Sequence, residues 1–171
     1  MGYGVIWALT AKVGLDHVSF AGTKINKLRL RDVRLIECDF SNAVGFEATR
    51  AEFVHCRMTG LRALGCQWRD VLVENCDLRY AQLNDSQIRS SEFKSCNMAE
   101  ADLRGTDLKG AIFTDVMLCK ADLSRAMLRG ADLRGAEIEG ITVKPEDLWG
   151  AIVRVAQAID LVRLLDQSAS C

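Results

Sequence analysis

The chain has 171 residues, with 22 Lys plus Arg against 23 Asp plus Glu and a formal net charge of −1. It is 49% hydrophobic and 26% charged, which is typical of one soluble domain with a sizeable core and excludes intrinsic disorder. The near-zero net charge excludes a bulk nucleic-acid binder, and the longest uncharged stretch, residues 1–11, is far shorter than the ~18 apolar residues of a membrane helix.

The first segment, residues 1–12, is apolar and non-repetitive. Repeat folds need capped ends, because an open end exposes backbone groups and apolar side chains. We therefore expect residues 1–12 to cap the N-terminal end. The segment lacks the basic start and small-residue cleavage site of a signal peptide, so we expect a cytoplasmic protein.

Residues 13–40 contain pairs of mostly apolar residues that recur every five positions. The six pairs are Val13/Leu15, Val18/Phe20, Thr23/Ile25, Leu28/Leu30, Val33/Leu35 and Cys38/Phe40. From Phe40 the next residue of the same kind in the main repeat, Ala48, is eight positions away instead of five. We therefore expect three extra residues in a loop over 41–45 (SNAVG), which bulges from the fold and shifts the register.

Residues 46–153 continue the five-residue period in this second register. A period of five fits neither one face of a helix nor one face of a long strand. The chain must instead turn a corner every five residues, so that the large residue of each block and the small residue two positions before it both point inward. Cys56, Cys76 and Cys96 lie 20 residues apart, as do Phe93 and Phe113. We therefore expect four short walls per coil and about seven coils.

The predicted core consists of inward residues of these blocks. Among them we single out Phe53, Cys56, Cys76, Phe93, Cys96, Leu103 and Phe113. The stacked cysteines are predicted to be small, reduced core residues. The alternative is a redox or soft-metal ladder, but three stacked thiols cannot all pair.

The blocks ADLRG, ADLSR and ADLRG, at residues 101–105, 121–125 and 131–135, follow the pattern A(D/N)LXX. In this the chain resembles the pentapeptide-repeat family, and the resemblance covers most of the sequence. It implies an all-β solenoid, specifically a right-handed quadrilateral β-helix.

The last segment, residues 154–167 (RVAQAIDLVRLLDQ), has apolar residues at helical spacing and predicts a C-terminal capping helix. We expect Val155, Ile159 and Val162 to cover the last coil. A wider apolar arc then remains for a homodimer interface, made by Leu161, Leu164 and Leu165. Family members pair end to end through C-terminal helices, so the resemblance implies the same. The alternative is a monomer whose flat helix buries the three leucines against Val143, Leu148 and Val153.

The sequence has no recognisable catalytic, cofactor or metal-binding motif. The two histidines, His17 and His55, stand alone, the cysteines lack zinc-ligand spacing, and no phosphate-binding or nucleophile-elbow motif occurs. We therefore expect no enzyme activity, no cofactor and no metal site.

Charged residues recur at outward positions of the blocks. We expect the repeated acids to face solvent as ion-pair partners of nearby Arg and Lys; they are Asp102, Asp107, Asp122, Asp132 and Asp147. One outward column is basic and consists of Arg69, Arg89, Lys109 and Arg129. It is a candidate partner-binding stripe for phosphates or for an acidic protein surface. The alternative is simple compensation by Asp70, Asp107 and Asp147.

These features favour a non-catalytic scaffold that mediates protein–protein interaction through its rigid faces. The alternative comes from the resemblance: Qnr-type and MfpA-type members of the family are DNA-like rods that bind DNA gyrase and give quinolone-type resistance. That mechanism needs a continuous acidic face. Residues 51–153 carry 16 acids and 13 bases, and the basic column has the wrong sign. We expect a protein partner, no membrane association and no direct nucleic-acid binding.

Overall fold

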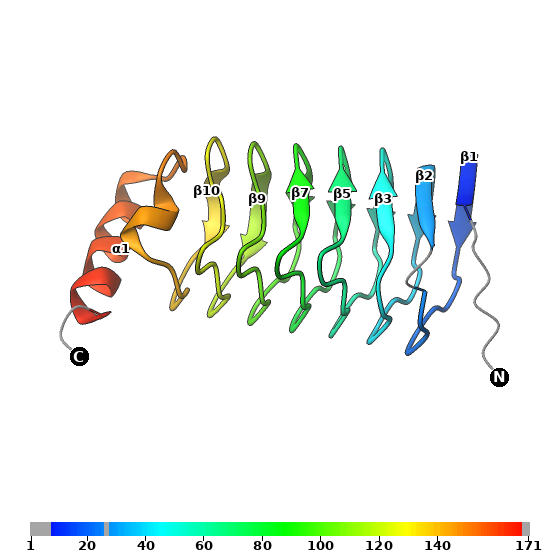
Figure 1. Cartoon of the computed structure of the whole chain (residues 1–171), viewed down its shortest axis with the longest axis horizontal. Coiled ribbons are helices and arrows are strands. Elements are labelled where there is room, and N and C mark those ends of the chain that lie inside the picture. Colours follow the sequence, from blue (N-terminus) through cyan, green and yellow to red (C-terminus); the bar gives the residue numbers. More distant parts are fainter. Residues whose placement is uncertain (1–7, 26–27, 169–171) are drawn as a thin grey trace.

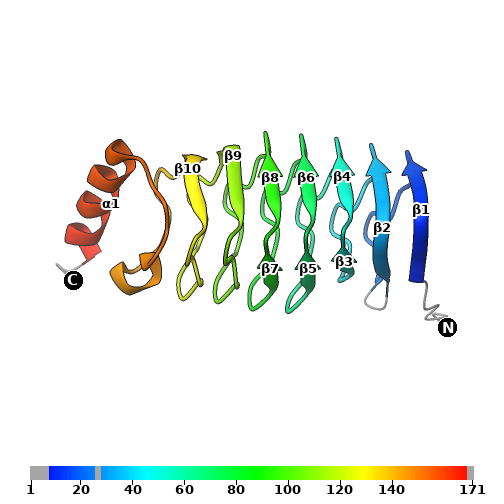
Figure 2. The same ribbon diagram turned by 90° about the horizontal axis from the view of Figure 1, so that it is seen from above.

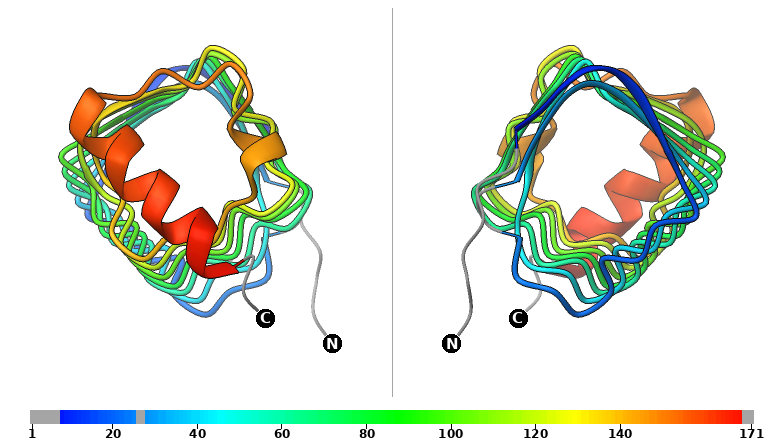
Figure 3. Two further views of the ribbon diagram at one scale, coloured as in Figure 1. Left: turned by 90° about the vertical axis from the view of Figure 1, so that its left-hand side faces the viewer. Right: turned by 90° about the vertical axis from the view of Figure 1, so that its right-hand side faces the viewer.

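The computed structural model describes residues 8–25 and 28–168. The chain winds into a parallel β-solenoid whose coils stack along one axis, with a single helix at the C-terminal end (Figure 1). Seen along this axis, each coil has a four-sided outline (Figure 3). The predicted solenoid with four short walls is confirmed.

The strands are three to nine residues long and are joined by tight corners. They are β1 (Ala8–Asp16), β2 (Arg29–Ile36), β3 (Glu47–Thr49), β4 (Glu52–Val54), β5 (Gln67–Arg69), β6 (Leu72–Glu74), β7 (Gln87–Arg89), β8 (Glu92–Lys94), β9 (Ile112–Met117) and β10 (Asp132–Glu137). A short 3-10 helix, η1 (Pro145–Leu148), and the helix α1 (Val155–Ser168) follow.

The strands β1, β2, β4, β6, β8, β9 and β10 stack in parallel on one wall, and β3, β5 and β7 stack on the next (Figure 2). From β1 to β10 the chain makes about six turns, close to the seven coils that we expected.

The five-residue period has a backbone cause. A residue with positive φ stands at the corners, as at His55 (φ 53°), Gly60 (66°), Gly65 (63°) and Asp70 (54°). This left-handed conformation reverses the chain direction locally, and it suits Gly, Asn and Asp best. Between corners, the two inward side chains of each block pack into the centre.

All seven residues that we expected in the core are at most 3% exposed. Aromatic rings fill the N-terminal coils: Phe46 stacks on Trp68 at 5.3 Å between ring centres, and Phe40 on Phe20 at 4.8 Å. Further along, Phe93 stacks on Phe113 at 5.2 Å. The pairs Phe20–Phe40 and Phe93–Phe113 join equivalent positions of successive coils, whereas the register partner of Trp68 is Ala48, two residues after Phe46. All these contacts between successive coils make the core continuous.

The register shift differs from our expectation. Residues 41–45 do not bulge: Ala43 is fully buried, and Val44 forms parallel bridges to both Lys24 and Arg62. The shift is a contraction. Glu47 follows Val44 by three positions, whereas in the next coil Gln67 follows Arg62, the bridge partner of Val44, by five positions. The eight positions from Phe40 to Ala48 are therefore two five-residue blocks from which two residues are missing. The large ring of buried Phe46 lies at the shortened corner.

The first strand begins at Ala8 and pairs with β2. It thus includes residues 8–12 of the segment that we expected to form the N-terminal cap. Residues 1–7 of that segment lie outside the described residues.

Helix α1 crosses the open end of the last coil (Figure 3), but with a different face from the predicted one. Gln157 and Leu161 face the coil, each 5% exposed. Val155, Ile159 and Val162 are 81%, 51% and 58% exposed. Gln157 selects this orientation, because its side-chain amide donates hydrogen bonds to the carbonyls of Leu133 and Ala136, both at 2.8 Å.

Leu161 is therefore part of the cap and not of an exposed interface. The side chains of Leu164 and Leu165 lie outside the described residues. Neither η1 nor the described α1 has the length and apolar character needed to cross a bilayer.

Candidate interaction surfaces

The wall formed by β3, β5 and β7 carries the predicted column of cations. Arg69 on β5 is the register partner of Arg89 on β7, and Lys109 and Arg129 follow in the next two coils. All four side chains are exposed. We call this wall the basic face.

Neighbours neutralise part of the column. Nε of Arg89 lies 2.6 Å from Oδ2 of Asp107, and Nζ of Lys109 lies 3.8 Å from the same oxygen. Asp107 is only 1% exposed, which corrects the expectation that it faces solvent: the two cations close over it. Arg129 lies over the Trp149 ring, 5.4 Å from its centre. Arg69 has no ion pair with any described residue.

The basic face extends further toward the N-terminus than the sequence indicated. Arg31 is the register partner of Thr49, which in turn pairs with Arg69. Together with Arg50 and Arg89, these residues line a shallow groove of about 370 Å³. Arg31 was missed because it lies 18 residues before Thr49, whereas the later coils repeat every 20. No signal in the sequence showed that the contraction lies between Arg31 and Thr49, at the corner from Val44 to Glu47.

Within this groove the other cations have partners. Arg29 pairs with Glu47 at 3.0 Å, and Arg50 binds both carboxylate oxygens of Asp32, at 2.6 and 2.8 Å. The hydrogen bond from Arg50 lowers the pKa of Asp32. Of the cations that line the groove, Arg31 and Arg69 thus remain without an ion pair to any described residue.

The adjoining wall, formed by β4, β6 and β8, carries more acids than bases, but cations interrupt them. Glu52 pairs with Arg34 at 3.3 Å. Glu74 pairs with Lys94 at 2.7 Å, and this hydrogen bond lowers the pKa of Glu74. Glu92 has no ion pair within the described ranges. The acids therefore do not form a continuous uncompensated strip.

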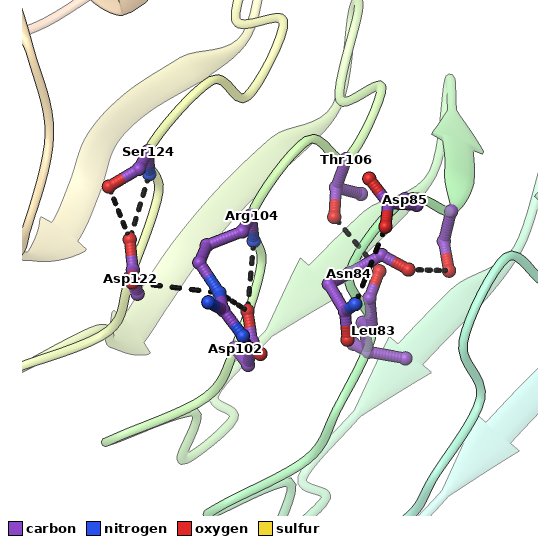
Figure 4. A network of polar contacts seen from close by, with 9 residues as sticks. Leu83, Asn84, Asp85, Asp102, Arg104, Thr106, Asp122 and Ser124 are labelled. Atoms are coloured by element: carbon purple, nitrogen blue, oxygen red, sulfur yellow. Dashed lines mark hydrogen bonds and ion pairs between the residues drawn. The ribbon is translucent and has the colours of Figure 1, made fainter.

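Three more of the repeated Asp residues, Asp102, Asp122 and Asp132, form ion pairs. Asp147 has no ion pair among the described residues, and its carboxylate instead accepts a hydrogen bond from the backbone N–H of Lys144 at 3.2 Å. Asp102 receives hydrogen bonds from Nε and Nη2 of Arg104, at 2.8 and 2.6 Å (Figure 4). Those bonds lower the pKa of Asp102. Arg104 also approaches Asp122 of the next coil at 3.7 Å, and Ser124 donates to that same carboxylate at 2.6 Å. These carboxylates are therefore partners in ion pairs within the solenoid, and each exposed pair contributes little to the free energy of unfolding.

The cysteine column is built into the wall. The thiols of Cys56, Cys76 and Cys96 lie 3.4, 3.4 and 3.2 Å from the carbonyl oxygens of Leu35, Phe53 and Val73. Each thiol can thus act as a weak donor to the preceding coil. The described cysteines, from Cys38 to Cys119, are free thiols, and all except Cys119 are buried. This arrangement fits the structural interpretation of the column.

The C-terminal end exposes a line of apolar side chains, which we call the terminal stripe: Val155, Ile159 and Val162. Trp149, 70% exposed, and Ile152, 43% exposed, precede the helix. Single exposed apolar residues are ordinary, but residues one helical turn apart form a ridge.

No group of three His, Cys, Asp or Glu residues suited to a metal ion occurs in the described part of the chain. Of the two histidines, His17 lies 3.1 Å from Glu37 through Nδ1, and both side chains are exposed. His55 stands exposed at a corner.

Comparisons with known proteins agree with this architecture. A family model described as a pentapeptide repeat region matches residues 30–103, and one described as pentapeptide repeats in eight copies matches residues 96–135. No curated protein sequence matches the chain.

Among solved structures, the fold resembles trypsin-treated QnrB1, a plasmid-mediated fluoroquinolone resistance protein. The TM-score is 0.54 at 20% identity, over 89% of this chain and 98% of that one. Rfr23, a pentapeptide repeat protein from the cyanobacterium Cyanothece 51142, matches with a TM-score of 0.35 at 17% identity, over 80% and 91% of the two chains.

Proposed function

Because the chain belongs to the pentapeptide-repeat family, we propose that it is a non-catalytic scaffold whose basic face binds an acidic surface of a partner protein. The observation that carries this proposal is the groove of about 370 Å³ on the basic face, in which Arg31 and Arg69 stand without ion pairs among the described residues.

The solenoid supports this role physically. Successive coils present their outward side chains about 4.8 Å apart, the ordinary spacing of paired strands. Arg31 and Arg69 lie two rungs apart, with Thr49 between them. Like charges repel one another, so the approach of a partner's carboxylates lowers the electrostatic free energy of these two arginines. The rigid wall fixes their positions before binding, which lowers the entropy lost on association.

The experiment is affinity capture from the native cell with matched variants. We expect the wild-type protein and the control Arg62→Glu, an exposed change on another wall, to retain the same acidic partner. A double variant, Arg31→Glu with Arg69→Glu, should lose it, and raised salt should release it. Retention of the partner by the double variant, or recovery of nucleic acid in its place, contradicts the proposal.

The second candidate is a rod that binds DNA gyrase and gives resistance to quinolone-type inhibitors. The similarity of fold to QnrB1 favours it. Against it stand the basic face and the ion pairs that interrupt the acids of the β4, β6 and β8 wall. A supercoiling assay with purified gyrase and a fluoroquinolone separates the two. Protection of gyrase by the protein supports this candidate, and an unchanged inhibition curve rejects it.

We also propose a homodimer joined through the C-terminal ends. The terminal stripe and Trp149 are the exposed apolar side chains that support it, because a two-fold pairing would bury the same ridge from both copies. The free thiols support a reducing, cytoplasmic compartment.

A further inference from the structure

The last coil leaves part of its backbone edge uncovered beside α1 (Figures 1 and 3). A groove of about 650 Å³ lies here, between the wall segment 136–140 and the side of α1 that carries Ala156, Asp160 and Arg163. We call it the terminal groove.

The edge of this groove has backbone donors without acceptors. In the preceding coil, the N–H groups of Leu118 and Lys120 donate to the carbonyls of Glu137 and Glu139, at 2.8 and 2.9 Å. Ile138 and Gly140 occupy the equivalent positions of the last coil. Their N–H groups have no acceptor among the described residues.

The capping helix satisfies only the first part of this edge. The Gln157 amide takes the place of a following coil at Leu133 and Ala136. Beyond Ala136 the edge continues to Gly140 along the floor of the terminal groove. The site is therefore an open edge of the last coil, at the end of β10 and in the corner that follows, next to a helix.

We propose that the terminal groove binds a peptide, as one additional rung of the solenoid, with a basic–apolar–basic sequence. The two free donors are two residues apart: Ile138 follows the end of β10, and Gly140 stands in the next corner with a φ of 67°. In the preceding coil the equivalent donors bind the carbonyls of Glu137 and Glu139, also two residues apart, so a peptide that follows the same path matches both donors. One small anion cannot reach both donors, which favours a peptide as the occupant.

The side chains of the edge set the preferred sequence. Glu137 and Glu139 are exposed on either side of buried Ile138, and neither has an ion pair among the described residues. A strand added to this edge places its own outward residues about 4.8 Å beyond the two carboxylates, where Lys or Arg is favoured. Its middle residue then stacks on Ile138, so it is apolar. Arg163 does not oppose this charge pattern, because it pairs with Asp160 at 3.8 Å. Arg154 adds a positive charge where α1 begins.

The terminal groove is distinct from the terminal stripe. At 100° per residue, Ala156, Asp160 and Arg163 lie about 100° around α1 from Val155, Ile159 and Val162. Peptide binding and pairing of two copies through the stripe therefore use different faces of the helix.

The test uses the full chain and the blocked pentapeptide Gly-Lys-Ile-Lys-Gly, followed by amide NMR spectra and hydrogen exchange. In the free protein, the amides of Ile138 and Gly140 should exchange at least tenfold faster than those of Leu118 and Lys120. Saturating peptide should slow them and shift their resonances. Equally slow exchange of all four amides in the free protein, or peptide-induced shifts confined to the basic face, overturns the proposal.

Charge reversal provides the second arm. Glu137→Lys with Glu139→Lys changes exposed residues and should weaken binding of the Lys peptide at least tenfold, while allowing Gly-Glu-Ile-Glu-Gly to bind. The control Glu92→Lys, an exposed change on β8, should leave affinity unchanged. Equal affinity of the wild-type protein for the Lys and Glu peptides, or no binding of either at millimolar concentration, rejects the proposed sequence preference and the site with it.

Discussion

Nε of Arg89 lies 2.6 Å from Oδ2 of Asp107, a carboxylate that is 1% exposed and belongs to the following coil. Two successive rungs are thus joined through a buried charge beneath the basic face. A cation that appears from the sequence to belong to a binding surface is, in part, the counter-ion of this carboxylate.

Removing that counter-ion should destabilise the fold. We expect Arg89→Ala to reduce the free energy of unfolding by about 1–3 kcal/mol, because it leaves Asp107 buried with fewer hydrogen bonds. The matched change Arg69→Ala should stay within about 0.5 kcal/mol of wild type, because Arg69 has no described ion pair. Urea denaturation measures both. Equal effects would show that Asp107 does not depend on Arg89.

The contraction near Phe46 makes residues 41–45 sensitive to deletion. Removing residues 41–43 should destabilise the protein severely, because it deletes buried Ala43 and shifts the bridges of Val44. Inserting Gly-Ser after Gly45, which restores the five-residue spacing of the next coil, should be better tolerated. Thermal unfolding compares the two variants, and a stable deletion variant would contradict the register described here.

Thiol labelling should follow burial. Cys119, partly exposed, should react with a thiol reagent well before the buried Cys56, Cys76 and Cys96. Burial also raises the pKa of Cys66 to about 11, so little of its reactive thiolate exists at neutral pH. Mass spectrometry of the native protein reads the order, and Cys171 lies outside the described residues. Rapid labelling of the whole column without denaturant would indicate that the coils open readily.

Assembly should depend on the terminal stripe. Ile159→Glu with Val162→Glu should give a folded monomer, because both residues are exposed and a charge there blocks apolar contact between copies. Leu161→Glu should instead unfold the cap, since Leu161 is 5% exposed against the last coil. Light scattering gives the mass and circular dichroism the folding. A wild-type protein that is already monomeric rejects the dimer.

Acid should weaken the surface pairs in a defined direction. The pKa values of Asp102 and Asp132 are lowered in the fold by hydrogen bonds from Arg104 and Arg134. Their contribution is therefore present above the unfolded pKa of about 3.9 and disappears as pH falls through the lower folded value. Arg104→Gln should be less stable than wild type at pH 6, with the difference shrinking toward pH 2. Arg62→Gln serves as the control in urea titrations at each pH.

The repeat determined much of this structure in advance. Since corners recur every five residues, inward positions such as Phe93 and Leu103 follow directly from the period. The contraction did not follow, because a separation of eight from Phe40 to Ala48 equals one block plus three or two blocks minus two. The burial of Ala43 and the two bridges of Val44 distinguish these alternatives.

The candidate surfaces were less accessible to sequence analysis. The apolar residues of α1 surround much of its circumference, so the side that meets the coil was undetermined. A polar residue, Gln157, decides it through two backbone carbonyls. The burial of Asp107 depends on how neighbouring coils place Arg89 and Lys109, which a single block does not encode.

The offset of 20 residues between the partners of β5 and β7 and of β8 and β9 allows the length of the rod to change by whole coils. Leu103, Leu123 and Leu133 occupy the centres of near-identical ADL blocks, so duplicating one such coil creates no new kind of contact. Each duplication would move the two ends apart by one strand spacing and leave their surfaces unchanged. The aromatic coils around Phe46 and Trp68 lack this freedom, because their rings fit one particular set of neighbours. The distance between the basic groove and the C-terminal end can therefore change by whole coils during evolution, while the N-terminal half stays fixed.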